Sequence, residues 1–371
     1  MKAKTLQSIR CSFFFCLSLI LGCGKSIPES SNFFLSNDYP EKLSDWNLVW
    51  LDGDSIKISE DSTVYKLNSS LFSDYASKLR TLRLPKGQAA VYEEHDSFVF
   101  PVGTIISKTF FYRSSDQQTV SLNSNWSGSP EDLTLDNTRL IETRLLVMQE
   151  TGWEALPYIW KGGEAYLTIT GDLKELTLAN TDESFFYQVP SKNQCASCHK
   201  TNHSEGALKP IGLKARHLNH SKTHYGENQL LHLQKNGQLT GLPKLEQAPQ
   251  LADFSDQSES IETRARAYLD INCAHCHNQK GPADTSALLL EYTDLKPRSY
   301  GRCKPPIATG RGSGGLLYSI VPGQAHESIM SFRLSSRDPA EMMPEIGRTL
   351  VHKEGVTLID KWINSMTGTC V

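Results

Sequence analysis

Two copies of one short pattern, Cys-x-x-Cys-His, constrain this 371-residue chain more than any other feature. They are made by Cys195, Cys198 and His199, and by Cys273, Cys276 and His277. A shuffled chain with the same nine cysteines and eleven histidines would contain about 0.006 such patterns. In each copy two thiols three residues apart lie about one helical turn apart, and an imidazole follows directly. Each segment is therefore expected to fold around a group that binds both sulfurs and the histidine.

This pattern is typical of c-type heme attachment, in which the thiols bond to the heme and the histidine is the proximal iron ligand. Four cysteines and two histidines could instead bind zinc. A redox-active Cys-x-x-Cys would need a βαβ context that is not visible here. The histidine directly after each second cysteine favours heme. The sequence therefore predicts two covalently bound heme c groups, with iron ligands His199 and His277.

The N-terminus has the composition of an export signal. Basic residues occur at positions 2, 4 and 10, and an apolar run of about eleven residues follows, which is too short to span a bilayer. Its end, Ile20-Leu21-Gly22-Cys23, resembles a bacterial lipoprotein box. In such signals the chain is cut before the cysteine, whose sulfur carries a lipid; an ordinary signal peptide is the alternative. The resemblance implies a signal peptide over 1–22 and lipidation of Cys23. The lipid would anchor the protein to a bacterial membrane, facing the periplasm, and the outer membrane is the favoured one.

Charge and the remaining cysteines narrow the class of protein further. Loss of residues 1–22 removes three basic residues, so the net charge falls from -3 to about -6, which excludes a nucleic-acid footprint. Two cysteines leave with the signal, one is lipidated and four bind heme. Cys303 and Cys370 are left over, and an isolated pair in an oxidising compartment usually bonds. A disulfide between them is expected.

Hydrophobic patterning divides the rest of the chain. After a polar tether over 23–40, residues 41–190 alternate with the period of β-strands. Expected strands are 98–100, 105–112, 145–148, 155–160, 165–169 and 185–189. The predicted fold class is multidomain α+β. It comprises an N-terminal antiparallel β-sandwich-like module over 41–190 and two mainly α-helical heme modules over 191–254 and 255–371.

Residues 255–371 resemble a class I cytochrome c domain. Apolar spacing predicts a helix over 258–271 that runs into the second motif and a terminal helix over 355–366. Between them Met343 precedes Pro344. In such domains a methionine beside a proline supplies the distal sulfur, so the resemblance points to Met343, with Met342 as the alternative. The alternative is that this methionine only fills space in the hydrophobic core.

The first heme lacks an obvious second ligand. No methionine occurs between Met148 and Met330, so a local thioether is excluded. His232 is favoured because an expected helix holds it among leucines. The alternatives are His217, His220, His224, Met148 from the N-terminal module, or an open iron, which would permit ligand chemistry.

Several short sequence segments extend the resemblance to the whole chain. They are Leu71-Phe-Ser-Asp-Tyr-Ala-Ser-Lys78 with Arg80, Phe100-Pro-Val-Gly-Thr104 with Lys108 and Phe110, Glu142-Thr-Arg-Leu-Leu146, Gly152-Trp153 and Tyr158-Ile-Trp160. Together with both motifs, they resemble a bacterial family of exported two-heme c-type cytochrome lipoproteins. Some of the charged residues could line a polar site or form an ion-pair network: Asp74, Lys78, Arg80, Glu142 and Arg144. A GxGxxG match at Gly310, Gly312 and Gly315 lacks a strand–turn–helix context and is rejected.

Motifs and resemblance together predict a membrane-anchored diheme cytochrome that transfers electrons between exported redox partners, such as a dehydrogenase, a reductase or another cytochrome. The alternative is a heme-dependent oxidoreductase, either peroxidase-like or a dehydrogenase subunit, with an open first heme. The two differ in whether the first iron binds exogenous ligands.

Overall fold

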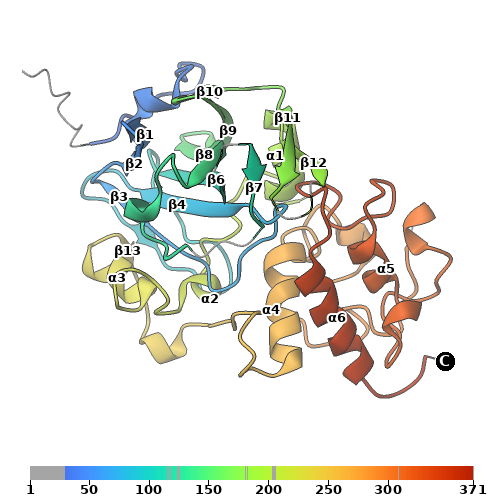
Figure 1. Ribbon diagram of the computed structural model, residues 1–371. Coiled ribbons are helices and arrows are strands. Elements are labelled where there is room, and N and C mark those ends of the chain that lie inside the picture. The colour runs from blue at the N-terminus through green and yellow to red at the C-terminus, as the bar shows by residue number, and fades with distance from the viewer. Residues whose placement is uncertain are drawn as a thin grey trace, which may run out of the picture.

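The computed structural model describes residues 30–371 except 115, 117, 123–125, 180, 182, 203–205, 308 and 371. The expected signal peptide and Cys23 therefore lie outside the described residues. A β-rich part (blue to green in Figure 1) stands beside a part built from helices and loops (orange to red). Among the described residues, no helix has both the length and the apolar character that a membrane span requires.

Six antiparallel strands form the main sheet, in the order β10-β9-β8-β6-β4-β3. They are β3 (Ser62–Val64), β4 (Ser77–Arg83), β6 (Ile105–Arg113), β8 (Thr138–Gln149), β9 (Gly152–Lys161) and β10 (Glu164–Leu167). Strands β8 and β9 pair from Gln149 and Gly152 onward. Gly152 has φ of 114°, which glycine tolerates because it lacks a Cβ. This tight connection keeps the two long strands in register.

Three smaller sheets surround the main one. β1 (Val49–Asp52) pairs with β2 (Ser55–Ile58), and β13 (Leu239–Thr240) pairs with β5 (Ala90–Val91). A three-stranded sheet has the order β12-β11-β7, from β7 (Thr119–Val120), β11 (Asp172–Leu178) and β12 (Ser184–Val189). Because β7 runs parallel to β11, this sheet is mixed.

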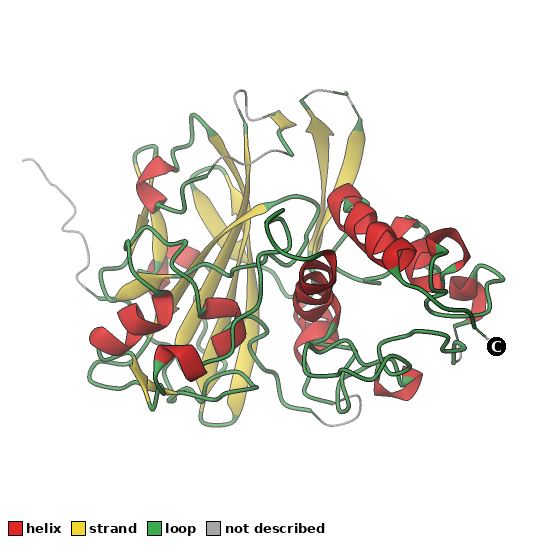
Figure 2. Cartoon of the chain, turned by 90° about the horizontal axis from the view of Figure 1, so that it is seen from below, coloured by secondary structure: helices red, strands yellow, loops and turns green. Residues whose placement is uncertain are grey.

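The two faces of the main sheet, seen from below in Figure 2, are covered differently. One face packs on a cluster that includes Trp46, Leu79 and Leu145. The opposite face meets two separate apolar clusters, one containing Ile106 and the other Phe110. Successive side chains on a strand point to opposite faces, so this division follows from the alternation of each strand.

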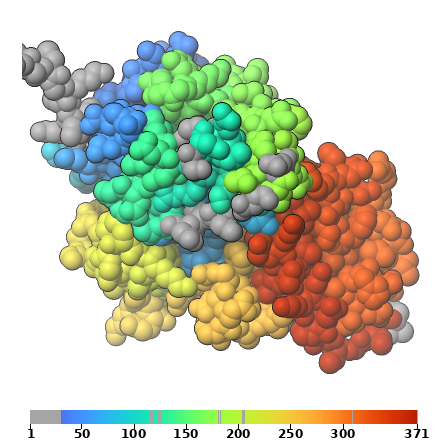
Figure 3. Space-filling model, in the orientation of Figure 1, coloured from blue at the N-terminus to red at the C-terminus, as the bar shows by residue number. Residues whose placement is uncertain are grey.

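Residues 191–254 pack directly on the second face of the sheet. Their helices are α1 (Lys192–His199), α2 (Ala215–Leu218) and α3 (Gln229–Lys235). Buried leucines of this segment, such as Leu218 and Leu230, share one cluster with Leu82 of β4 and Ile106 of β6. The yellow surface in Figure 3 accordingly lies against the blue and green surface.

The C-terminal part contains α4 (Ile261–Cys273), α5 (Ile329–Ser335) and α6 (Lys353–Ser365). Its core gathers Tyr268, Ile359 and Trp362. A Cβ on Gly355 would lie 2.3 Å from the Tyr268 hydroxyl, so α6 approaches α4 closely only because this residue is glycine. Cys303 and Cys370 form a disulfide that joins the chain end to the loop before α5.

Short 3-10 turns complete the structure. They are η1 (Leu43–Trp46), η2 (Pro130–Asp132), η3 (Leu245–Gln247), η4 (Asp284–Ser286), η5 (Gly310–Ser313) and η6 (Ala325–Glu327). Much of the chain between α4 and α5 is loop, with three of these turns.

The predicted fold class is wrong. The described residues form thirteen strands in four sheets but only six α-helices, so they do not form a β-sandwich-like module followed by two mainly α-helical heme modules. The helices of 191–254 have eight, four and seven residues. Helices this short cannot enclose a core of their own. Their apolar side chains instead complete the core of the main sheet.

Candidate functional site

The first motif lies on α1. Ser191 begins this helix with a reciprocal capping box: its hydroxyl accepts from the Gln194 amide, and the Gln194 side chain accepts from the Ser191 amide. Cys195, Cys198 and His199 follow within the eight-residue helix, which packs on β9. Local sequence therefore determines the helical geometry that the motif needs.

The His199 ring is fixed by a backbone contact. Its Nδ1 lies 2.7 Å from the Lys209 carbonyl oxygen, to which a neutral ring donates. Nε2 is then left with its lone pair, the state in which an imidazole binds a metal. Burial lowers the pKa of His199 to about 4, so the ring is neutral near pH 7.

A first cavity, of about 120 Å³, separates α1 from the second face of the main sheet. Cys195, Cys198 and His199 line one wall. Arg80 of β4, Lys108 of β6 and Arg144 of β8 line the sheet wall, and Arg348 contributes from the loop before α6. Among the described lining residues there are four such cations and no carboxylate.

Of the five charged residues singled out from the sequence, four are buried and Arg144 is partly exposed, with 23% of its side chain accessible. Glu142 binds the Arg144 guanidinium at 2.8 and 2.5 Å and accepts from the Tyr187 hydroxyl at 2.7 Å. Asp74 instead accepts from the backbone amides of residues 349 and 350. Lys78 donates to the Ala76 carbonyl, and burial lowers its pKa well below the usual value. The five residues therefore do not form one network, and of the five only Arg80 and Arg144 line the cavity.

The second motif begins at the C-terminal end of α4. The Ser286 hydroxyl lies 3.3 Å from His277 Nδ1, and burial lowers the pKa of His277 to about 4. A second cavity, of about 90 Å³, is lined by Cys273, His277, Met330 and Met343 among others. The structure thus brings Met343 to the cavity of His277.

The loop carrying Met343 is held by Arg348. The buried guanidinium donates to the Met343 carbonyl at 2.8 and 3.1 Å, and to the carbonyls of residues 333, 336 and 350. Met342, the alternative ligand, is also buried but does not line this cavity. Of the two methionines, only Met343 lines the cavity of His277 among the described residues.

The two motifs meet. Cys276 Sγ lies 3.7 Å from the Ser197 carbonyl oxygen, although 79 residues separate them. The two thiols Cys198 and Cys276 interact, which lowers the pKa of Cys198 and raises that of Cys276. A third cavity of about 510 Å³ is lined by residues of both motifs, together with Met343. It shares Cys198 with the first cavity and His277 with the second, so the three adjoin.

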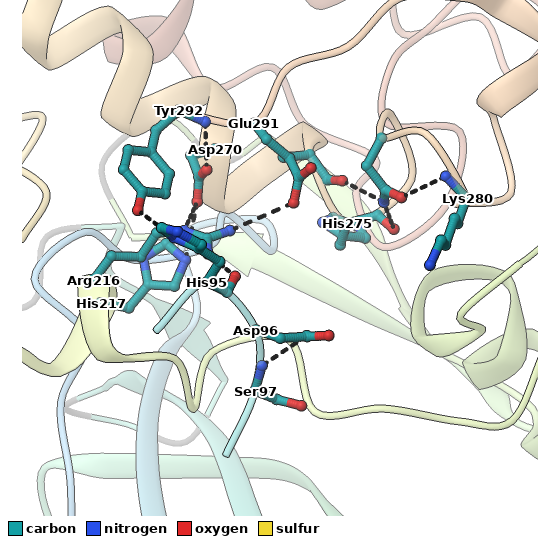
Figure 4. A network of polar contacts seen from close by, with 12 residues as sticks. His95, Asp96, Ser97, Arg216, His217, Asp270, His275, Lys280, Glu291 and Tyr292 are labelled. Carbon is teal, nitrogen blue, oxygen red and sulfur yellow. Dashed lines mark hydrogen bonds and ion pairs between the residues drawn. The ribbon is translucent and has the colours of Figure 1, made fainter. Parts of the chain in front are cut away.

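A buried network fixes this juxtaposition (Figure 4). Asp270, one turn before the second motif, accepts from Arg216 Nε of α2 at 2.9 Å, and His217 Nε2 lies 3.1 Å away. The Tyr292 amide donates to the other oxygen at 2.9 Å. Hydrogen bonds from His217 and the charge of Arg216 outweigh burial and hold the pKa of Asp270 well below its usual range. The network ties the segment after the first motif to the helix that carries the second.

The residues considered as second ligands of the first heme lie elsewhere. His232 Nδ1 is 2.8 Å from Glu227 and its Nε2 is 2.9 Å from the Asn236 amide nitrogen. The other candidates are also held outside the three cavities: His217 by Asp270, His220 by the Lys66 carbonyl, His224 against Tyr225, and Met148 on β8. None of them lines the cavity of His199 among its described residues.

Two residues of the site were not identified from the sequence. His275, inside the second motif, lines the first and third cavities, and its buried Nδ1 has no hydrogen-bond partner in the described structure. Lys108 lines the first cavity, where burial and two neighbouring arginines lower its pKa to about 7. The available signal was a lysine in the middle of the strand Ile105–Arg113, on the same face as Ile106 and Phe110.

No known protein family, curated protein or solved structure matches this chain. The described residues contain no group of three or more His, Cys, Asp or Glu side chains arranged to hold a metal ion. A heme iron needs only one or two axial side chains. The residues present fit such a group: each motif presents a neutral imidazole to a cavity, and the first cavity has a cationic wall that lacks an anion.

Proposed function

We propose that this protein is a diheme c-type cytochrome that passes single electrons between exported redox partner proteins. One observation carries the proposal: the two Cys-x-x-Cys-His motifs, 78 residues apart in sequence, meet at a shared cavity, with Cys276 Sγ 3.7 Å from the Ser197 carbonyl. Two prosthetic groups attached there would be neighbours. Neighbouring redox groups inside one fold suit electron relay.

The residues of the two motifs would have separate roles in binding the hemes. Four sulfurs, those of Cys195, Cys198, Cys273 and Cys276, would hold the two hemes covalently. His199 and His277 would be the proximal ligands, oriented by contacts to their Nδ1 atoms. When bound, each heme supplies one-electron redox chemistry.

Different surroundings of the two sites support unequal reduction potentials. Met343 lies at the cavity of His277, and a thioether ligand raises the potential of a heme. The cavity of His199 presents Arg80, Lys108 and the imidazole of His275. The heme with the higher reduction potential would therefore be reduced before the other.

Heme content in variants tests the proposal. The pyridine hemochrome assay on the wild type should give two hemes per chain. Replacing Cys195 and Cys198 by alanine should leave one, as should replacing Cys273 and Cys276. Replacement of the disulfide pair is the matched control, because it also removes two cysteines but should leave both hemes. A wild-type ratio near zero would refute the proposal.

A heme-dependent oxidoreductase with an open first heme is the second candidate. The positions of the candidate second ligands support it. His232 and the four other residues considered for this role all lie outside the cavity of His199. Cyanide or carbon monoxide should then perturb the spectrum of one heme, whereas a pure carrier should show no change. Low-temperature EPR would read the axial ligands directly.

A further inference from the structure

Three cations form a row across the main sheet. Arg80 of β4 is the direct cross-strand partner of Lys108 of β6, and Lys108 is the direct partner of Arg144 of β8. Side chains directly opposite one another in a sheet have Cβ atoms about 5 Å apart, and like charges there are destabilising. Such a row requires negative charge nearby.

Protein carboxylates supply only part of that charge. Glu142 binds Arg144 through both oxygens. Neither Arg80 nor Lys108 has an ion pair within 4 Å among the described residues. Arg80 is 6% exposed and reaches only the Lys78 carbonyl, at 3.4 Å. Burying an unpaired cation costs several kcal/mol. Arg80 therefore lacks compensation, and burial beside Arg144 and Arg80 lowers the pKa of Lys108 to about 7.

The row lies at the cavity of the first motif. On one side the neighbouring cross-strand row is apolar, with Leu82, Ile106 and Leu146. On the other side lies Phe110, whose ring the Lys108 ammonium and the Arg144 guanidinium approach at 5.2 and 4.3 Å. Between them, the charged row lines the same cavity as Cys195, Cys198 and His199. An anion in this cavity would meet both uncompensated cations.

We propose that Arg80 and Lys108 bind the two propionate carboxylates of the heme attached at Cys195 and Cys198. This assignment rests on the proposed function. A heme c brings two carboxylates, one for each of the two cations of the row that no protein carboxylate pairs. The planar guanidinium of Arg80 suits a carboxylate because it donates two parallel hydrogen bonds. The same cations would suit a free oxyanion, and the test separates these two sources.

The test measures the reduction of each heme by spectroelectrochemical titration in Arg80→Gln and Lys108→Gln. Reduction adds an electron, so a positive charge near one heme favours its reduced form. Removing that charge leaves a propionate uncompensated, and the reduced form of that heme becomes less stable. We expect the equilibrium constant for reduction to fall about tenfold, a potential lower by about 59 mV for one electron. Only one of the two waves should shift. That wave should also become pH-dependent around pH 4 to 5, because a propionate without its cation takes up a proton near the ordinary pKa of a carboxyl group.

Arg83→Gln is the matched control. It removes the same charge from the same strand, but Arg83 pairs with Asp61 and does not line the cavity. Arg80→Lys and Lys108→Arg keep the charge and should keep the wild-type potential. If a glutamine variant loses the first heme in the hemochrome assay, these two should retain it.

Three results would overturn the assignment. The first is no shift beyond that of Arg83→Gln, and the second is an equal shift in the charge-retaining variants. The third is a spectral response to added nitrite or acetate in the wild type that the glutamine variants lose, since the row would then hold a free anion. A wild-type hemochrome ratio near zero refutes the proposed function itself, and this assignment with it.

Discussion

Removing the carboxylate of Asp270 should destabilise the fold far more than breaking a surface ion pair. Asp270 and Arg216 are 0% and 2% exposed at their side chains, with Arg216 Nε 2.9 Å from the carboxylate. Asp270→Asn would leave the buried Arg216 charge with only the more distant carboxylate of Glu291, at 3.9 Å. Breaking a buried pair in this way costs about 3–5 kcal/mol. The variant should therefore unfold at a markedly lower urea concentration.

Asp338→Asn provides the matched control. Asp338 also pairs with an arginine, Arg311, at 2.7 Å, but the side chains are 40% and 68% exposed. An exposed pair contributes about 0–1 kcal/mol, because water and salt screen it. Urea unfolding followed by circular dichroism measures both variants. Equal losses for Asp270→Asn and Asp338→Asn would refute the argument that burial makes the pair indispensable.

The contribution of Asp270 has a definite pH dependence. Its folded pKa is lower than the unfolded value near 3.9. A carboxylate whose pKa is depressed by folding contributes fully above the unfolded pKa and loses that contribution as the pH falls below it. The stability difference between the wild type and Asp270→Asn should be constant from pH 7 to about pH 5 and shrink below about pH 4. A difference that already shrinks between pH 7 and 5 would contradict the assignment to Asp270.

Three further predictions concern the other parts of the chain. Met343→Ala should lower the potential of one heme in a redox titration, because a thioether ligand is lost. Met342→Ala should leave that potential unchanged. It should instead lower the free energy of unfolding in urea by about 2–5 kcal/mol, because it leaves a cavity. Replacing Cys303 and Cys370 by alanine should destabilise the fold by about 2–4 kcal/mol without changing the hemochrome ratio, since neither cysteine lines any of the three cavities. Cys23→Ser should abolish membrane fractionation and the lipid mass seen by mass spectrometry, and a Cys23→Ser protein that still carries lipid would contradict the lipoprotein reading.

Local patterns predicted the individual elements better than their assembly. The helix expected over 258–271 occurs as α4 (Ile261–Cys273), and that expected over 355–366 occurs as α6 (Lys353–Ser365). The long strands β6 and β9 closely match the ranges expected from alternation. The segment 98–100 forms only an isolated bridge at Val99. Periodicity reports which face of an element is apolar, but not which other element covers that face.

That limit explains why the fold class was wrong. The leucines of 191–254 indicate helices, but nothing in their spacing shows that Leu218 and Leu230 pack on Leu82 and Ile106 of the sheet. For the same reason, the sequence could not identify a second ligand for the proposed first heme. His232 sits on a helix among leucines, as expected, yet that helix holds its imidazole against Glu227, outside the cavity of His199.

The sequence by itself supplied the two Cys-x-x-Cys-His motifs from which heme attachment is predicted. A cysteine pair and a histidine within five residues need only one helical turn to come together, so each motif is complete in local sequence. Only the tertiary structure decided that the two motifs meet at one cavity, and that Arg80, Lys108 and Arg144 form a row facing the adjoining cavity of His199. Strand register and helix packing depend on contacts between residues far apart in the chain, and those contacts are fixed only when the whole core closes.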